Sequence, residues 1–135
     1  DEQGKPSVTI YRVRETYDPH AASPADRYTL LELDLKTGRT HQIRVHLSHL
    51  GYPIVADDMY GGRPFVDGDG REIITRQALH AAMLSFERPI WGQKMVFPAP
   101  LRGDMAELGR VLRGRRGHES LTPPGSSLDI AQLIR

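Results

Sequence analysis

Two runs of alternating residues near the N-terminus place the tightest limit on the fold. Residues 7–17 (SVTIYRVRETY) are rich in β-branched and aromatic side chains, which favour a strand. Residues 28–35 (YTLLELDL) carry leucines at every second position on one face and acidic side chains on the other. Residues 18–26, between them, hold two prolines and small polar side chains and predict a loop. Because a single loop joins the two strands, we expect them to pair antiparallel.

A short helix is predicted after the second strand. Thr40 is suited to cap a helix that runs from residue 41 to about residue 49, and Gly51 is suited to end it. The side chains expected to face the core recur at helical spacing and are Ile43, Leu47 and Leu50. This segment therefore adds an amphipathic helix to the strand pair.

The second half of the chain predicts a hairpin and further helices. Residues 77–86 fit a helix by composition, but the turn and the strand-like residues 93–97 that follow favour a hairpin. Residues 101–112 predict a helix with one buried face, and residues 128–135 predict a short one. Residues 57–69 hold several glycines and predict a loop. Together these elements predict an α+β fold, with a mixed, largely antiparallel sheet and flanking helices.

The composition is that of a soluble globular domain without disulfides. A chain of 135 residues with 39% hydrophobic and 26% charged residues fits one domain. It holds no long apolar run, so we expect no membrane span, and it has no cysteine, which fits a reducing cytoplasm. The net charge of +1 gives no bulk sign of a nucleic-acid partner. Residues 109–118, however, carry four arginines and no acid, so they either bind phosphate or form a solvated tail.

The densest cluster of polar side chains lies in residues 37–46 (TGRTHQIRVH), where strand, turn and helix meet. Free N–H groups and the helix dipole make such a helix start suited to an anion. Arg44 would stand on a rigid helix, where a guanidinium can hold a carboxylate through two parallel hydrogen bonds. His41 lies one turn earlier on the same face. A solvated helix start with routine charges is the alternative.

Residues 37–62 (TGRTHQIRVHLSHLGYPIVADDMYGG) resemble the third sequence motif of the RNA pseudouridine synthases that modify bacterial large-subunit rRNA and tRNA. Residues 4–13 (GKPSVTIYRV) resemble the strand that precedes this motif in the family, and residues 76–105 resemble its closing segment. The three blocks follow in the family's order and cover residues 4–112, which makes the resemblance far more specific than one short motif.

The resemblance implies a cofactor-free isomerase that flips a uridine out of RNA and converts it to pseudouridine. In the family an Asp in an H-R-L-D motif carries the chemistry with the help of a Tyr, and this chain holds neither block. We therefore expect residues 1–112 to be the C-terminal portion of the catalytic domain and part of its catalytic sheet. The missing N-terminal half would be a partner, and the chain alone would be inactive. Residues 113–135 are expected to form a basic, flexible tail that contains Pro, Gly and Ser. The expected setting is the cytoplasm, with rRNA or tRNA as partner and no membrane.

The resemblance also assigns site residues. Arg44 matches the family arginine that pairs with the catalytic Asp, so it is the expected catalytic residue of this chain. The residues expected to approach RNA are Arg39, His41, Gln42 and Leu79, the last of them beside the uracil ring unless it is an ordinary core leucine. Asp57 and Asp58 fall in a segment resembling V-G-D-x-x-Y-G, which has a mainly structural role. In that segment Ala56 stands where the family usually has Gly.

Two rival functions stay open from the sequence. A metal site is disfavoured. His46 and His49 share a helix face, but no further His or carboxylate stands at a spacing that would complete the ligand shell. We therefore expect no metal. A non-catalytic RNA-binding remnant could hold phosphates through Arg39, Arg44 and residues 110–116. The gene sequence upstream of this segment distinguishes part of an enzyme from a non-catalytic remnant. An H-R-L-D motif there would make the chain part of an enzyme.

Overall fold

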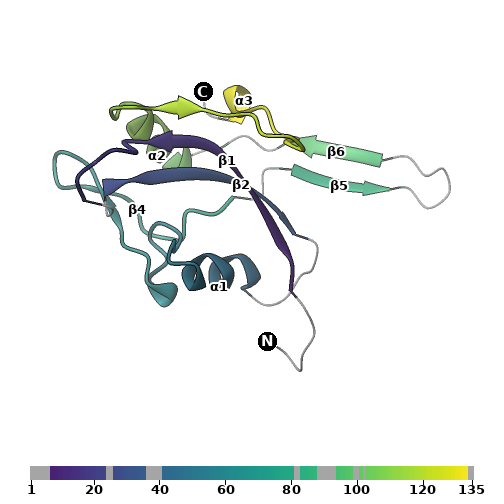
Figure 1. Ribbon diagram of the computed structural model, residues 1–135, viewed down its shortest axis with the longest axis horizontal. Coiled ribbons are helices and arrows are strands. Elements are labelled where there is room, and N and C mark those ends of the chain that lie inside the picture. Colours follow the sequence, from purple (N-terminus) through teal and green to yellow (C-terminus); the bar gives the residue numbers. More distant parts are fainter. Residues whose placement is uncertain are drawn as a thin grey trace.

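The computed structural model describes residues 7–23, 26–35, 41–80, 83–87, 94–98, 101 and 103–133. In chain order, the elements labelled in Figure 1 and the short ones between them are β1 (Thr9–Tyr17), β2 (Tyr28–Leu35), α1 (Gln42–His49), η2 (Asp58–Tyr60), β3 (Phe65–Val66), β4 (Glu72–Ile74), β5 (Met83–Glu87), β6 (Lys94–Pro98), α2 (Gly103–Arg113), β7 (Glu119–Ser120) and α3 (Ile130–Leu133). Helices and antiparallel strand pairs occur together, so the fold is of the predicted α+β class.

β1 and β2 form the long antiparallel pair that the alternating residues predicted. Their register shifts between Val13 and Glu15, which makes Arg14 the extra residue of a β-bulge. The bulge breaks the alternation of side chains along β1. As a result, two successive charged side chains, Arg14 and Glu15, are both buried.

The hydrophobic core lies between the end of β1, the β3–β4 hairpin and α2. Its buried members are Tyr17, Ala56, Phe65, Ile73, Ile74, Met105, Leu108 and Leu112. α2 packs against β4 and buries the face that its spacing predicted. The β3–β4 hairpin was not predicted, and β3 lies within the segment expected to be a loop. Strands of two and three residues carry too little alternation to be seen in a sequence.

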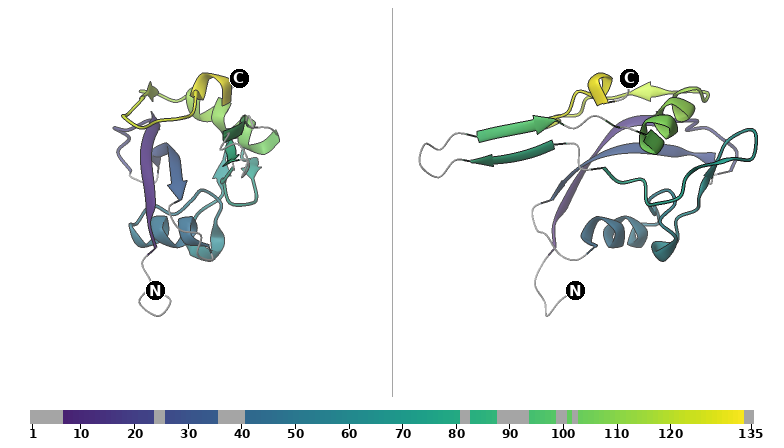
Figure 2. Two further views of the ribbon diagram at one scale, coloured as in Figure 1. Left: turned by 90° about the vertical axis from the view of Figure 1, so that its right-hand side faces the viewer. Right: turned by 180° about the vertical axis from the view of Figure 1, so that it is seen from behind.

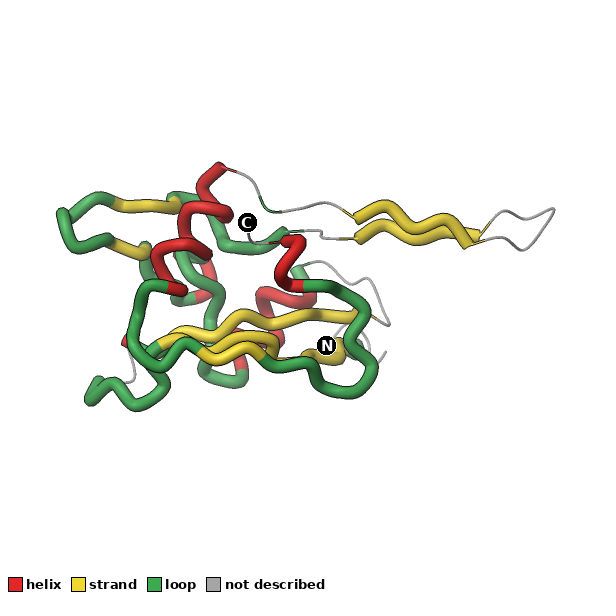
Figure 3. Tube along the Cα trace, turned by 90° about the horizontal axis from the view of Figure 1, so that it is seen from above, coloured by secondary structure: helices red, strands yellow, loops and turns green. Residues whose placement is uncertain are grey.

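β5 and β6 form the predicted hairpin, with Met83 opposite Pro98 and Glu87 opposite Lys94. This hairpin extends away from the rest of the described chain in Figure 1, in the right view of Figure 2 and in Figure 3. In the view of Figure 1, α1 lies below the β1–β2 pair, α3 lies above it, and α2 overlaps β1.

The segment after α2, which the sequence assigned to a tail, is bound to β1 and β2 at several points. Arg14 donates from Nη1 to Glu32 Oε1 over 2.6 Å and from Nε to the carbonyl oxygen of Leu121 over 2.9 Å. Glu32 Oε2 accepts hydrogen bonds from the backbone N–H and the Oγ of Ser127, both at 3.0 Å. α3, the short helix predicted at the end of the chain, packs against Leu30.

A second buried carboxylate joins β1 to the same segment. Glu15 accepts from Arg113 Nε at 3.1 Å and Nη2 at 2.5 Å, from Tyr17 Oη at 2.5 Å and from Ser120 Oγ at 3.2 Å. His118 Nε2 lies 3.4 Å from the carboxylate. Burial alone would raise the pKa of Glu15, but the hydrogen bonds from Arg113, Tyr17 and His118 outweigh it and lower the pKa to about 2. Burial and the contact with Glu15 raise the pKa of Tyr17.

Two details of the predicted helix α1 need correction. The helix begins at Gln42 and its N-cap residue is His41, one position after Thr40, which lies outside the described residues. Leu47 is buried as predicted, but Leu50 is 55% exposed because it follows the last helical turn as the C-cap residue. Gly51 ends the helix, and its φ of +90° is a left-handed conformation that glycine adopts without strain.

Candidate functional site

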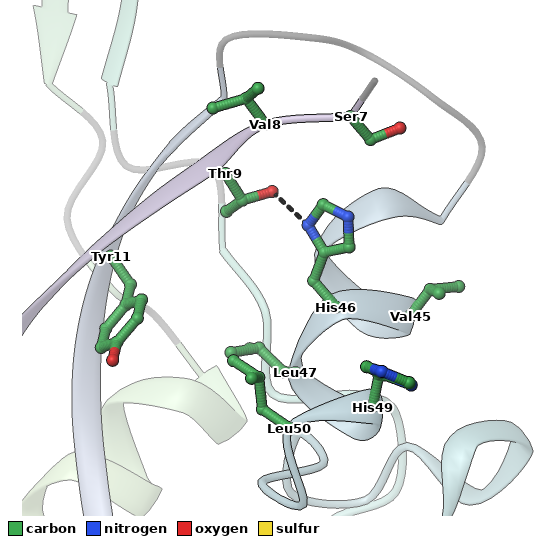
Figure 4. Close-up of a pocket in the computed structure, with 9 residues that line it drawn as sticks. All are labelled: Ser7, Val8, Thr9, Tyr11, Val45, His46, Leu47, His49 and Leu50. Atoms are coloured by element: carbon green, nitrogen blue, oxygen red, sulfur yellow. Dashed lines mark hydrogen bonds between the residues drawn. The ribbon is translucent and has the colours of Figure 1, made fainter. Parts of the chain in front are cut away.

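α1 is fastened to β1 by side chains on its inner face. Gln42 is 5% exposed, and its Nε2 donates to the carbonyl oxygen of Val8 and to Thr9 Oγ1, both at 2.8 Å. Thr9 Oγ1 also lies 2.9 Å from His46 Nδ1, and Figure 4 shows the two side chains pointing toward one another. Gln42, expected to approach RNA, therefore makes a buried contact that fixes the position of the helix on the strand.

Arg44, the predicted catalytic residue, is held by a carboxylate from the loop that follows α1. Its Nε donates to Asp57 Oδ2 over 2.9 Å and its Nη2 donates to Asp57 Oδ1 over 2.8 Å. The Arg44 side chain is 13% exposed and that of Asp57 only 1%. The hydrogen bonds to Asp57 raise the pKa of Arg44, so the guanidinium stays charged. The two parallel bonds fix both the place and the plane of the guanidinium.

The backbone of residues 54–62 places this carboxylate. Ala56 adopts a left-handed φ of +64°, and the N–H of Asp57 donates to the carbonyl oxygen of Ile54 over 3.0 Å. The N–H of Gly62 returns to the carbonyl oxygen of Asp57 over 2.7 Å. Gly62 has no room for a side chain, because an added Cβ would lie 2.0 Å from the Ile54 oxygen. The turn is therefore tightly folded around Asp57.

Tyr60 completes the surroundings of the guanidinium. Its ring centre lies 5.0 Å from the guanidinium carbon of Arg44, within the range of a cation–π contact. Tyr60 Oη lies 3.0 Å from His41 Nδ1, and the two rings meet edge to face. Ser48 Oγ donates to the carbonyl oxygen of Tyr60 over 2.7 Å and joins η2 to α1. The structure thus brings two predicted site residues, Arg44 and His41, together around Tyr60.

The geometry leaves one edge of the Arg44 guanidinium for a further ligand. The side edge, formed by Nε and Nη2, is taken by Asp57. Within the described part of the chain, no side chain or carbonyl accepts a hydrogen bond from Nη1, and Nη2 has a weak second contact with the exposed Met59 at 3.9 Å. Because a guanidinium presents five N–H donors, its Nη1–Nη2 edge can hold a second carboxylate in a bidentate manner.

The remaining predicted site residues lie elsewhere. Leu79 is half-buried in the segment between β4 and β5, and its backbone N–H donates to the carbonyl oxygen of Gln77 over 2.8 Å. Arg39 lies outside the described residues. The sequence did not predict that Asp57 and Tyr60 contact Arg44. Their only signal was the Asp-x-x-Tyr spacing in a glycine-rich loop, and a loop has no periodicity that tells which side chain points inward.

A groove runs between β1 and α1, with a volume of about 380 Å³ (Figure 4). Its lining residues are Ser7, Val8, Thr9, Tyr11, Val45, His46, Leu47, His49 and Leu50. Apolar side chains at its rim are strongly exposed, from 41% for Val45 to 55% for Tyr11. Contiguous exposed apolar surface of this kind is typical of a surface that another part of a protein covers.

The four arginines of the basic segment 109–118 fall into two groups, one bound within the fold and one exposed. Arg113 is bound to the buried Glu15, and Arg115 lies over the rings of Tyr28 and Phe65 at 5.0 and 5.2 Å. The arginines on the exposed side are Arg110 and Arg116. Two of the four arginines therefore stabilise the fold.

Among the described residues, no group of three or more His, Asp or Glu side chains is placed to hold a metal ion. Within the same residues, no helix has the length and apolar character needed to cross a bilayer.

Comparison with known proteins identifies the family. Residues 1–49 match a family model described as RNA pseudouridylate synthase. One curated relative shares 47% identity with the chain over an alignment 117 residues long, and this alignment covers 82% of the chain. The chain therefore belongs to the RNA pseudouridine synthases, as the resemblance of its motifs predicted.

Among the similar proteins of that family are ribosomal large subunit pseudouridine synthases D. The chain is 47% identical to that of Vibrio vulnificus, 45% to that of Haemophilus influenzae and 45% to that of Escherichia coli. Each comparison covers 82% of this chain, but only 34%, 34% and 33% of the respective relative. The chain thus spans about a third of the length of these relatives.

Proposed function

We propose that the chain is part of an enzyme that isomerises uridine to pseudouridine in large-subunit ribosomal RNA. The observation that carries the proposal is the state of Arg44, which is rigidly held, charged and able to bind one more carboxylate through its Nη1–Nη2 edge. The catalytic Asp of the family would come from another part of the longer protein. An Asp beside this guanidinium stays ionised and oriented, as needed to attack or deprotonate the ribosyl unit. The uracil then detaches, turns and rejoins the ribose through carbon.

The substrate part of the proposal rests on the relatives, whose names state the ribosomal large subunit. Transfer RNA is the other substrate class that the family resemblance allows. His41 is exposed at the start of α1 and Arg110 and Arg116 are exposed on the basic segment, so these side chains are open to contact with RNA. Action in the cytoplasm, where ribosomal RNA is made and modified in bacteria, follows from this substrate.

The role of Arg44 is tested in the complete protein that contains this segment. Arg44→Ala is expected to lower the single-turnover rate of pseudouridine formation about 100-fold or more, because the reacting carboxylate loses its orientation. The Kd for RNA is expected to stay within about twofold, since one internal guanidinium adds little to phosphate binding. The matched control is Arg63→Ala, which removes an exposed arginine next to the same loop. Equal turnover in the Arg44→Ala and wild-type proteins would contradict the assigned role.

The same assay separates the enzyme from the rival function. A complete protein that binds RNA with salt-dependent affinity but forms no pseudouridine would be a non-catalytic RNA-binding remnant. Tritium release from RNA labelled at uracil C5 reports the isomerisation directly, because the C5 hydrogen leaves when carbon joins the ribose.

The proposal includes a docking surface for the remainder of the catalytic domain. A strand of that remainder would pair with β1 and extend the sheet. β7 pairs with β1 only at Glu15 and Thr16, so within the described chain residues 9–13 have a strand partner on the β2 side alone. An uncovered strand edge favours pairing with another strand. Thr9 and Tyr11 of the same strand line the groove, and Tyr11 belongs to its exposed apolar rim. The N-terminal part of the longer protein is the occupant that fits, since two thirds of the relatives' length lies outside this chain.

The docking surface is tested by producing this chain and the preceding part of the protein as two polypeptides. The two are expected to associate, and Tyr11→Asp is expected to weaken association at least about tenfold. Tyr52→Asp is the matched control, because Tyr52 is 74% exposed and does not line the groove. Association that is indifferent to Tyr11→Asp would contradict this surface.

A further inference from the structure

Asp57 is the buried carboxylate that holds Arg44, and the proposed function assigns it no role of its own in catalysis. It is only 1% exposed, and it is bound to Arg44 through both of its oxygens. Its neighbour Asp58 is exposed, and no hydrogen bond joins Asp58 to Arg44 among the described residues. A buried carboxylate that engages only one edge of a guanidinium controls where the other edges point.

We propose that Asp57 is the positioning residue for Arg44, and that it aims the free Nη1–Nη2 edge at the place of the catalytic carboxylate. This inference rests on the proposed function of Arg44. The Arg44 side chain has several rotatable bonds, and a single second carboxylate could pull it into many orientations. Its side edge is bound to Asp57 and its central carbon lies 5.0 Å from the centre of the Tyr60 ring. The end edge is left, where Nη2 has only the weak contact with Met59 at 3.9 Å. The guanidinium is then oriented before RNA binds.

The loop around Asp57 has the stiffness that such a role needs. Gly62 closes the turn over the Asp57 carbonyl oxygen, and Ser48 ties the turn to α1 at Tyr60. α1 is in turn held to β1 by Gln42. Arg44 on α1 and Asp57 in the loop are therefore joined both by their own two hydrogen bonds and by the bond between Ser48 and Tyr60.

The first test uses the complete protein and its single-turnover rate of pseudouridine formation. Asp57→Asn is expected to slow the rate about 100-fold while RNA affinity stays within about twofold. Asp58→Asn makes the same chemical change one residue away and is expected to leave the rate unchanged. Asp57→Glu keeps the charge and is expected to restore part of the rate. If Asp57→Asn is as fast as wild type, the positioning role is wrong.

A double-mutant comparison separates positioning from general support of the fold. Once Arg44 is replaced by Ala, the further change Asp57→Asn is expected to have no effect on the rate, because nothing is left to orient. A carboxylate with only a structural role would slow the Arg44→Ala variant by the same factor as it slows the wild type. That second outcome would overturn the proposal.

The second test measures proton exchange in the unsubstituted chain, so it depends neither on catalysis nor on whether a variant folds. In the 135-residue chain, the Nε–H proton of Arg44 is expected to exchange with water far more slowly than that of the exposed Arg63, as measured by ¹⁵N NMR. Equal exchange of the two protons would overturn the positioning claim. If the complete wild-type protein forms no pseudouridine, the proposed function fails, and slow exchange at Arg44 would still support the orientation by Asp57.

Discussion

Replacing the buried carboxylate of Glu15 by the amide in Glu15→Gln is expected to destabilise the chain by about 3 kcal/mol. Glu15 Oε1 faces Arg113 Nε and Tyr17 Oη, whereas Oε2 faces Arg113 Nη2 and Ser120 Oγ. Whichever oxygen becomes the amide nitrogen, an N–H of Arg113 then faces a second donor, whereas the hydroxyl of Tyr17 or Ser120 can turn and accept. Loss of one partner from a buried ion pair costs about 3–5 kcal/mol. The lower value applies because the Arg113 side chain is 30% exposed and can be hydrated once it is released.

Urea unfolding of the 135-residue chain, followed by far-UV circular dichroism, measures this loss. With a slope of about 1.5 kcal/mol per M, a loss of 3 kcal/mol lowers the unfolding midpoint by about 2 M. Glu119→Gln is the matched control, since Glu119 is exposed on β7 beside the same network, and its effect is expected to stay within about 0.5 kcal/mol. If Glu15→Gln costs no more than Glu119→Gln, the buried carboxylate does not hold the C-terminal segment to β1.

The other predictions concern pH, a loop glycine and activity. Because the pKa of Glu15 is lowered from 4.5 to about 2 in the folded chain, its stabilising effect is complete above pH 4.5 and is lost as pH falls toward 2. The urea midpoint of the wild type should therefore fall more steeply over this window than that of Glu15→Gln. Gly62→Ala is expected to cost at least about 2 kcal/mol in the same unfolding measurement, because its Cβ would meet the Ile54 oxygen, whereas Gly68→Ala has open space and should cost less than about 1 kcal/mol. The 135-residue chain alone is expected to release no tritium from uridine-labelled RNA, and any release above background would show that it needs no carboxylate from elsewhere.

Elements whose residues follow a regular period were predictable from the sequence. The strands β1 and β2 and the helix α2, with its buried Met105 and Leu108, follow from alternation or helical spacing. The β5–β6 hairpin was inferred instead from the turn and the strand-like residues that follow β5. The start of α1 was predicted within one or two residues, which is the usual uncertainty of a helix end.

What the sequence did not predict depends on contacts between distant residues. The bulge at Arg14 turns two charged side chains inward, and their partners Glu32 and Arg113 lie in other elements. Nothing in the local pattern of β1 distinguishes these buried charges from solvated ones. The same holds for Arg44. Its presence in a helix was evident, but its bond to Asp57, thirteen residues further on, depends on the left-handed turn between them.

The backbone at Ala56 has a consequence for how relatives of this chain are recognised. A left-handed φ of +64° costs an alanine roughly 1 kcal/mol relative to a glycine. Ala56, however, is only 8% exposed within the core, and burial of one methyl-sized group returns about 0.8 kcal/mol. The two contributions nearly cancel, so exchange between glycine and alanine at this place is close to neutral. A search pattern that demands glycine there would overlook proteins that fold this turn equally well.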